Sequence, residues 1–159
     1  MSSSRNRVTA SSPSRFYFRI LSLLCALLLS AFAMAAETLT LEAESQVLDL
    51  DAATIFDSST MAPTAPAGAD VRLTYNADRV PHAVVFPVGD GVELAFIAGV
   101  GFDGISSSDI PSLTFSSEPP DLPLSANDCV VVRTDQGTFF KLGNATESGL
   151  SITFDYEML

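Results

Sequence analysis

Apolar and polar residues alternate with a period of two through much of the chain after residue 36. Leu39, Leu41 and Ala43 alternate with polar residues, and the final stretch "LSITFDYEML" follows the same pattern. Such alternation is the main sequence sign of a β-strand that buries one face, whereas the 3.6-residue period of a helix is almost absent from this part of the chain. The pattern therefore predicts an all-β protein.

Two glycine-containing turns connect pairs of apolar runs. Asp135-Gln136-Gly137 joins "CVVVRT" to "TFFKL", and a glycine at the third position favours a bulged β-hairpin. We expect Arg133 and Lys141 on the solvent face of this hairpin, paired with carboxylates. Asp90-Gly91 lies between "AVVFP" and "VELAFI" and predicts a second hairpin over residues 82–97.

Residues 36–159 read as about seven or eight short, mostly antiparallel strands, by the spacing of turn signals. No repeat and no visible boundary divides them, so a single β-sandwich or a flattened barrel is the economical arrangement. The segment from Gly99 to Asp128 predicts a long surface connection held by apolar anchors of its own. The expected anchors are Phe102, Ile105, Ile110, Leu113 and Phe115.

The first 35 residues have the three parts of a secretory signal peptide. Four arginines precede an apolar block from Ile20 to Leu29, and Ala33-Met34-Ala35 follows it. This order predicts cleavage after Ala35, with Ala36 as the second choice. The processed chain, residues 36–159, is expected to be secreted or periplasmic, or to lie at the cell surface, without stable insertion in a membrane. An uncleaved anchor is the alternative, since the apolar stretch is just long enough to cross a bilayer.

Processing makes the chain strongly acidic, because four of the eight basic residues lie in the signal and none of the 19 acidic residues does. The remaining basic residues, Arg72, Arg79, Arg133 and Lys141, leave a formal net charge of −15. Nucleic acids and anionic lipid headgroups need Lys and Arg contacts, so this balance argues against both. The expected partner is an unidentified protein, glycan or small-molecule ligand, and a solvated acidic surface without a partner is the alternative.

Cys129 is the one cysteine that remains after processing, so no internal disulfide is expected in the processed chain. It adjoins the apolar run "VVV", and the simplest interpretation is a buried strand thiol. An intermolecular disulfide or a reactive thiol is the alternative for an unpaired cysteine in an exported protein.

The stretch "DCVVVRTDQGTFFKLGN", followed by "GLSITFDYEML", resembles the C-terminal part of secreted bacterial β-rich domains, including the HmuY-like haem-binding family. The likeness consists of a Val-Val-Arg-Thr strand, a glycine turn, an aromatic-Lys strand and a last alternating strand, over roughly the final thirty residues. It implies a secreted β-rich fold. A pair of histidines holds haem in that family, and His82 is the single histidine here, so the haem ligands do not carry over.

Carboxylates are the best candidate metal ligands in the chain. Asp49 and Asp51 form one pair, and Asp103 to Asp109 in "DGISSSD" form another, with hydroxyls between them. Calcium prefers such oxygen ligands, but neither group has EF-hand spacing, and Asp49 and Asp51 would most simply face water from one strand. The sequence therefore assigns no metal ligand and no cofactor, with calcium as the open alternative. One His and one Cys far apart do not make a zinc or iron site.

The sequence assigns no catalytic residue and no binding residue. The favoured hypothesis is an exported, non-catalytic β-domain that acts as a recognition or structural module outside the cytoplasmic membrane, with any binding surface on the connection from Gly99 to Asp128. A small secreted hydrolase that uses His82 is one alternative. A calcium-dependent adhesion or stabilisation module is the other.

Overall fold

The computed structural model describes residues 35–43, 45–57, 66–75, 83–120 and 124–159. These residues belong to one compact unit, Met34–Leu159, and their regular structure is two antiparallel sheets. The all-β class and the β-sandwich are thereby confirmed. The expected signal peptide lies outside the described residues, apart from Ala35. No helix in the described ranges is both long and apolar enough to cross a membrane.

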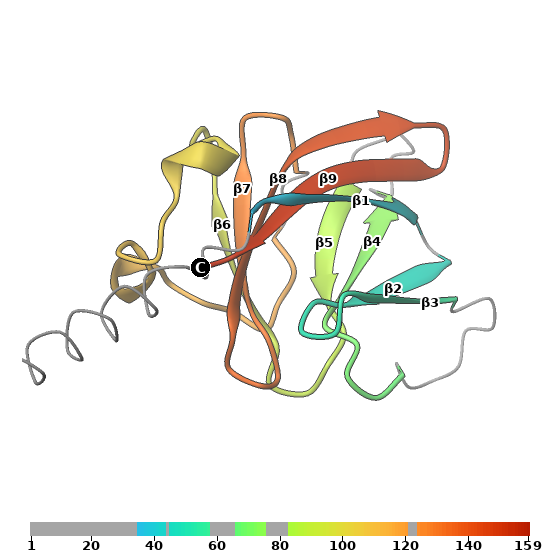
Figure 1. Cartoon of the computed structure of the whole chain (residues 1–159), viewed down its shortest axis with the longest axis horizontal. Coiled ribbons are helices and arrows are strands. Elements are labelled where there is room, and N and C mark those ends of the chain that lie inside the picture. Colours follow the sequence, from blue (N-terminus) through green and yellow to red (C-terminus); the bar gives the residue numbers. More distant parts are fainter. Residues whose placement is uncertain (1–34, 44, 58–65, 76–82, 121–123) are drawn as a thin grey trace, which may run out of the picture. The chain divides into compact units, whose positions relative to one another are not determined.

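Nine strands lie in the described part of the chain, and Figure 1 shows their arrangement. They are β1 (Glu37–Glu42), β2 (Gln46–Asp49), β3 (Thr54–Asp57), β4 (Val71–Tyr75), β5 (Ala83–Pro87), β6 (Glu93–Ile97), β7 (Cys129–Arg133), β8 (Phe139–Ser148) and β9 (Ser151–Met158). The five-stranded sheet has the order β1-β9-β8-β7-β6, and the four-stranded sheet has the order β3-β2-β4-β5.

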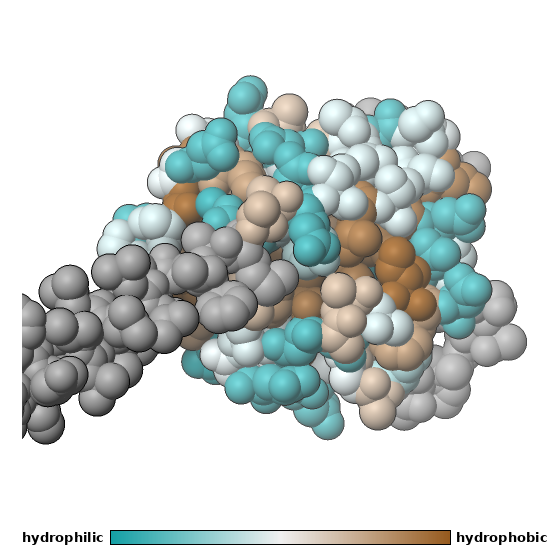
Figure 2. Space-filling view, viewed as in Figure 1, coloured by the Kyte–Doolittle hydropathy of each residue, from teal (hydrophilic) through white to brown (hydrophobic). Residues whose placement is uncertain are grey.

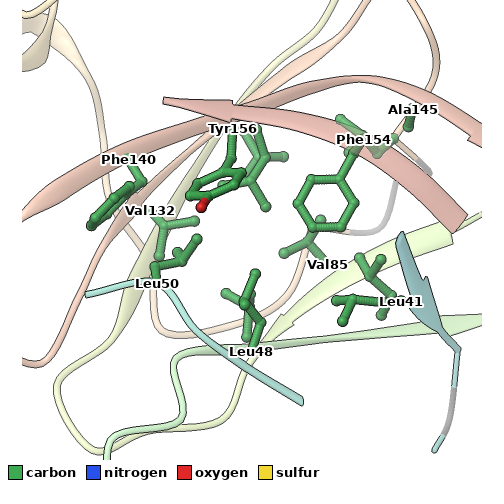
Figure 3. Packing of buried hydrophobic residues seen from close by; sticks show 14 of the residues in the cluster. Leu41, Leu48, Leu50, Val85, Val132, Phe140, Ala145, Phe154 and Tyr156 are labelled. Carbon is green, nitrogen blue, oxygen red and sulfur yellow. The ribbon is translucent and has the colours of Figure 1, made fainter. Parts of the chain in front are cut away.

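The inner faces of the two sheets enclose the main hydrophobic core (Figure 3). Phe140, Val132 and Tyr156 reach in from the five-stranded sheet, and Leu48 and Leu50 reach toward them from the other sheet. Each is almost fully buried, and burying one such side chain contributes about 1.5–3 kcal/mol to folding. The alternation read from the sequence therefore places these apolar residues correctly on the buried face, but it fails at the two ends of "LSITFDYEML", where Leu150 and Met158 are exposed.

The outer face of the five-stranded sheet is also covered, along β6, β7 and β8. Ala95, Cys129 and Val131 lie on this face and are buried together with Ile105 in a second hydrophobic cluster. Because the first four residues of β7 are buried on both faces of the sheet, their sequence "CVVV" is continuously apolar rather than alternating.

The cover is the connection between β6 and β7, which contains two single-turn 3-10 helices, η1 (Phe102–Gly104) and η2 (Ile110–Ser112). Of the expected anchors, Phe102 and Ile105 are buried, Leu113 and Phe115 pack against the second cluster, and Ile110 is half-buried. The connection is therefore part of the packed structure.

The turn at Asp135-Gln136-Gly137 joins β7 to β8 as predicted. The strands pair in antiparallel register, and Gly137 has a φ of 82°, in the left-handed region that favours glycine. The prediction for its two basic residues is half right. Arg133 is partly exposed and pairs with Glu93, but Lys141 is buried, because η1 and the residues that follow it cover that part of the outer face.

The hairpin predicted over residues 82–97 is wrong. β5 pairs with β4 in the four-stranded sheet, whereas β6 pairs with β7 in the other sheet. The backbone N–H of Val88 donates to the carbonyl of Asp70, so the chain stays beside the four-stranded sheet for one more residue before it crosses. Asp90-Gly91 therefore belongs to a crossing between sheets, and buried Val92 anchors its far end in the core.

Candidate metal centre

Three aspartates meet at one end of the four-stranded sheet. Asp49 is the last residue of β2, Asp51 lies in the turn toward β3, and Asp70 directly precedes β4. They lie close together because β2 pairs with β4, with Leu48 opposite Val71. The backbone N–H of Asp70 donates to the carbonyl of Leu48 at 2.9 Å, which extends this pairing by one step.

Gly68 allows the chain to pass over Asp49 on its way to β4. Its φ is 84°, and a Cβ at this position would lie 2.8 Å from Oδ2 of Asp49. Conformation and space therefore both favour glycine here. As a result Asp49 is only 8% exposed. The expectation that Asp49 and Asp51 face water is wrong for Asp49, and Asp51 is half-buried.

The three carboxylates form a compact group, which we call the aspartate cluster. One carboxylate oxygen from each of Asp49, Asp51 and Asp70 lies within 4.8 Å of the other two. Oδ1 of Asp49 accepts the N–H of Ala52, and Oδ2 of Asp70 accepts the N–H of Leu50, both at 2.8 Å. These backbone bonds hold Asp49 and Asp70 in place.

Two oxygens of the aspartate cluster remain without a partner. Oδ2 of Asp51 and Oδ1 of Asp70 are buried and accept no hydrogen bond from any described residue. Asp70 as a whole is 0% exposed. A buried acceptor that stays unpaired costs about 1–3 kcal/mol, and more when it is charged, so the arrangement is unfavourable without a positively charged partner.

The pKa of Asp70 reflects the same lack of a positively charged partner. Burial raises its pKa from 3.8 to about 6, opposed by the hydrogen bond from Leu50. Repulsion from Asp51 raises it further, whereas the backbone N–H of Asp135 lowers it and the Asp135 carboxylate raises it.

No described basic residue offsets this charge. Lys141 pairs with Glu157, Arg133 pairs with Glu93, and the Arg72 guanidinium lies over the ring of Phe86, 5.3 Å from its centre. None of the three is among the groups that shift the pKa of Asp70. The aspartate cluster therefore presents only oxygen donors and negative charge, a donor set that suits Ca²⁺ or another hard divalent cation.

The second acidic group expected from the sequence is organised differently. Asp109 accepts hydrogen bonds from the backbone N–H and the hydroxyl of Ser106, and these bonds lower its pKa. Within the described ranges, Asp103 and Asp109 do not belong to a group of three ligating side chains. Asp109 thus closes a local turn.

The remaining candidate residues are placed as follows. Cys129 is a free, fully buried thiol, as the simplest interpretation expected, and burial raises its pKa to about 11. His82, the candidate of the hydrolase hypothesis, lies outside the described residues. Asp70 was missed by sequence reasoning, and its only signal was a lone acidic residue between the small residues of "AGAD" and an apolar strand.

Comparison with known proteins adds no relative. No protein-family model matches the chain, and neither curated proteins nor solved structures give a significant match.

Proposed function

We propose that this chain is an exported, non-catalytic β-sandwich that works as a recognition or structural module outside the cytoplasmic membrane, and that Ca²⁺ bound at the aspartate cluster stabilises it. The observation that carries the proposal is the pair of buried, unpartnered oxygens on Asp51 and Asp70. Export is supported by the signal-like residues 1–35. Calcium is abundant outside cells, and its sites use carboxylates and backbone carbonyls.

The acidic character of the chain is consistent with this role. Figure 2 shows hydrophilic residues spread over the visible face of the sandwich, with apolar residues between them. A net charge of −15 on the processed chain attracts divalent cations and repels nucleic acid. We therefore propose a divalent cation, rather than a nucleic acid, as the ligand of this chain.

Thermal unfolding with added calcium tests the proposal. A cation that binds only the folded state adds stability that grows with the logarithm of its concentration, about 2.7 kcal/mol at one hundred times its dissociation constant, and therefore raises the melting temperature. The melting temperature of the purified protein in excess CaCl₂ should exceed that in excess chelator by several degrees. Equal melting temperatures in the two solutions would refute the proposal.

Two matched variants locate the site. Asp70→Asn keeps an acceptor oxygen for the N–H of Leu50 but removes the charge, so this variant should fold and lose the calcium response. Asp103→Asn removes the same charge from an exposed residue outside the aspartate cluster and should keep the response. A full response in Asp70→Asn, or its loss in Asp103→Asn, would place the bound cation elsewhere.

A further inference from the structure

The segment that carries Asp70 lies against the crossing between the two sheets, residues 88–92. The carbonyl of Asp70 accepts the backbone N–H of Val88 at 2.9 Å. Strand register brings these residues together, because Val71 at the start of β4 lies opposite Pro87 at the end of β5. From there the crossing runs to β6 in the other sheet (Figure 1). The crossing therefore begins beside the backbone of one member of the aspartate cluster.

Gly89 allows the crossing to approach this segment closely. A Cβ at position 89 would lie 2.7 Å from the carbonyl oxygen of Ala69 and 2.8 Å from Cγ2 of Val92. Ala69 and Val92 are each 1% exposed, so neither can move aside without disturbing the surrounding packing. Gly89 is not among the glycines with a positive φ. Space, rather than backbone conformation, therefore requires glycine at this position.

Asp70 is held by three segments at once. Its N–H donates to the carbonyl of Leu48, and its carbonyl accepts the N–H of Val88, both at 2.9 Å. Its Oδ2 accepts the N–H of Leu50 at 2.8 Å. Because Ala69 directly precedes Asp70 in the chain, displacement of Ala69 by the crossing would also displace Asp70. The position of the buried, unpartnered Oδ1 of Asp70 thus depends on how the crossing packs.

We infer that Gly89 is a positioning residue of the cation site, because it lets the crossing pack against Ala69 and so hold the carboxylate of Asp70 beside those of Asp49 and Asp51. The inference rests on the proposed cation site. Calcium sites hold their oxygen ligands at about 2.3–2.6 Å from the ion, so displacing Asp70 weakens binding. Coupling of this kind is reciprocal, and the bound cation therefore stabilises the packed form of the crossing.

Calcium titration of Gly89→Ala tests the positioning role, with the intact chain as reference and Gly101→Ala as the matched control. Gly101 has a φ of −65°, and no atom lies within 4 Å of its added Cβ. Isothermal titration calorimetry with CaCl₂ should show affinity about tenfold lower in Gly89→Ala, and unchanged within about twofold in Gly101→Ala. The titration is done well below the melting temperature, where a purely structural loss of stability leaves the affinity of the folded protein unchanged.

The titration separates the inference from the proposed function. Affinity in Gly89→Ala equal to that of the intact chain would overturn the inference, while the proposed function would stand. Absence of calcium binding by the intact chain would overturn both.

Hydrogen exchange on the intact protein tests the reciprocal effect and does not depend on the folding of a variant. Calcium should slow amide exchange in peptides that cover residues 49–52 and 68–71, and also in the peptide that covers the crossing, residues 88–92. The peptide over the β8–β9 turn, residues 148–151, is the control and should keep its rate. If calcium slowed exchange at residues 49–52 and left residues 88–92 unchanged, the crossing would not be coupled to the site.

Discussion

The ammonium group of Lys141 lies 3.0 Å from a carboxylate oxygen of Glu157, on the outer face of the five-stranded sheet. The same Nζ donates to the carbonyl of Ile105 at 3.1 Å and lies 4.4 Å from the ring centre of Phe102. A single buried cation thus joins two neighbouring strands to the connection that covers them. Lys141 therefore acts as an anchor for that connection.

Replacing Lys141 should destabilise the protein far more than replacing Arg133. The side chain of Lys141 is 8% exposed, and Lys141→Met leaves the carboxylate of Glu157 and the carbonyl of Ile105 without their donor. We expect a loss of about 2–3 kcal/mol of unfolding free energy. The Arg133 side chain is 43% exposed, and removing such a pair with Arg133→Gln should cost at most about 1 kcal/mol.

Urea denaturation of the two variants measures this difference. Arg133 and Lys141 both lie on the β7–β8 hairpin, and each pairs with a glutamate of a neighbouring strand, so the comparison isolates burial from charge. Similar losses in the two variants would mean that the contacts of Lys141 with the connection contribute nothing.

The thiol of Cys129 should be inert in the folded protein. Burial raises its pKa to about 11, although the charge of Lys141 and a hydrogen bond from the backbone of Leu142 lower it. Because the thiolate is the reactive form, alkylation by iodoacetamide at pH 8 should proceed only through unfolding. Mass spectrometry of the peptide that contains Cys129 should show little label in buffer and full label in denaturant. Rapid labelling in buffer would show that the outer-face cover opens readily.

Sequence reasoning predicted the features that depend on neighbours along the chain. The β7–β8 turn follows from a glycine in a local pattern, and the buried residues of β9 follow from strict alternation. Asp90-Gly91 carries the same local signal as a hairpin turn, but the partner of β6 is decided by packing, so the predicted hairpin was wrong. A turn signal specifies a change of direction and leaves the choice of sheet open.

The aspartate cluster also combines a part that neighbouring residues predict with a part that depends on strand pairing. Asp49 and Asp51 are two residues apart and were recognised as a pair, but Asp70 joins them only through the pairing of β2 with β4. Lys141 is similar, because its burial depends on a connection that begins over thirty residues before it. Contacts between residues far apart in the sequence leave no periodic pattern, so they cannot be deduced from one sequence.

Gly143 should tolerate alanine poorly. A Cβ added at this strand position would lie 3.0 Å from Cβ of Phe102 and 3.2 Å from the carbonyl oxygen of Asp128. Both neighbours belong to the connection over the outer face, so Gly143→Ala should push that cover outward and cost about 1–3 kcal/mol. Gly101→Ala is the control, since no atom lies within 4 Å of its added Cβ and its φ is −65°. Thermal unfolding should leave the control within about 0.5 kcal/mol of the parent, and a similarly mild Gly143→Ala would mean that the cover adjusts freely.

Asp70 should make the calcium-free protein less stable as the pH rises. Its pKa is about 6 in the folded protein against 3.8 for an unperturbed aspartate, so the folded state holds the proton more tightly than the unfolded state does. Such a group contributes stability that is full below pH 3.8 and is lost as the pH rises through 6. Between pH 5 and 7 the loss should be about 1 kcal/mol.

Urea denaturation in chelator at pH 5, 6 and 7 measures this loss, and Asp70→Asn is the control. The variant lacks the titrating carboxyl but keeps every other ionisable group, so the difference between the two pH profiles belongs to Asp70 and its neighbours. Three other aspartates have lowered pKa values: Asp109, Asp128 and Asp155. Their contribution to stability is lost at a more acidic pH, so it does not change between pH 5 and 7. Saturating calcium should flatten the profile of the parent, because the cation replaces the proton as the partner of the buried oxygen. If the pH profiles of the parent and of Asp70→Asn were parallel in chelator, burial would not raise the pKa of Asp70. The argument for a cation at the aspartate cluster would then lose its physical basis.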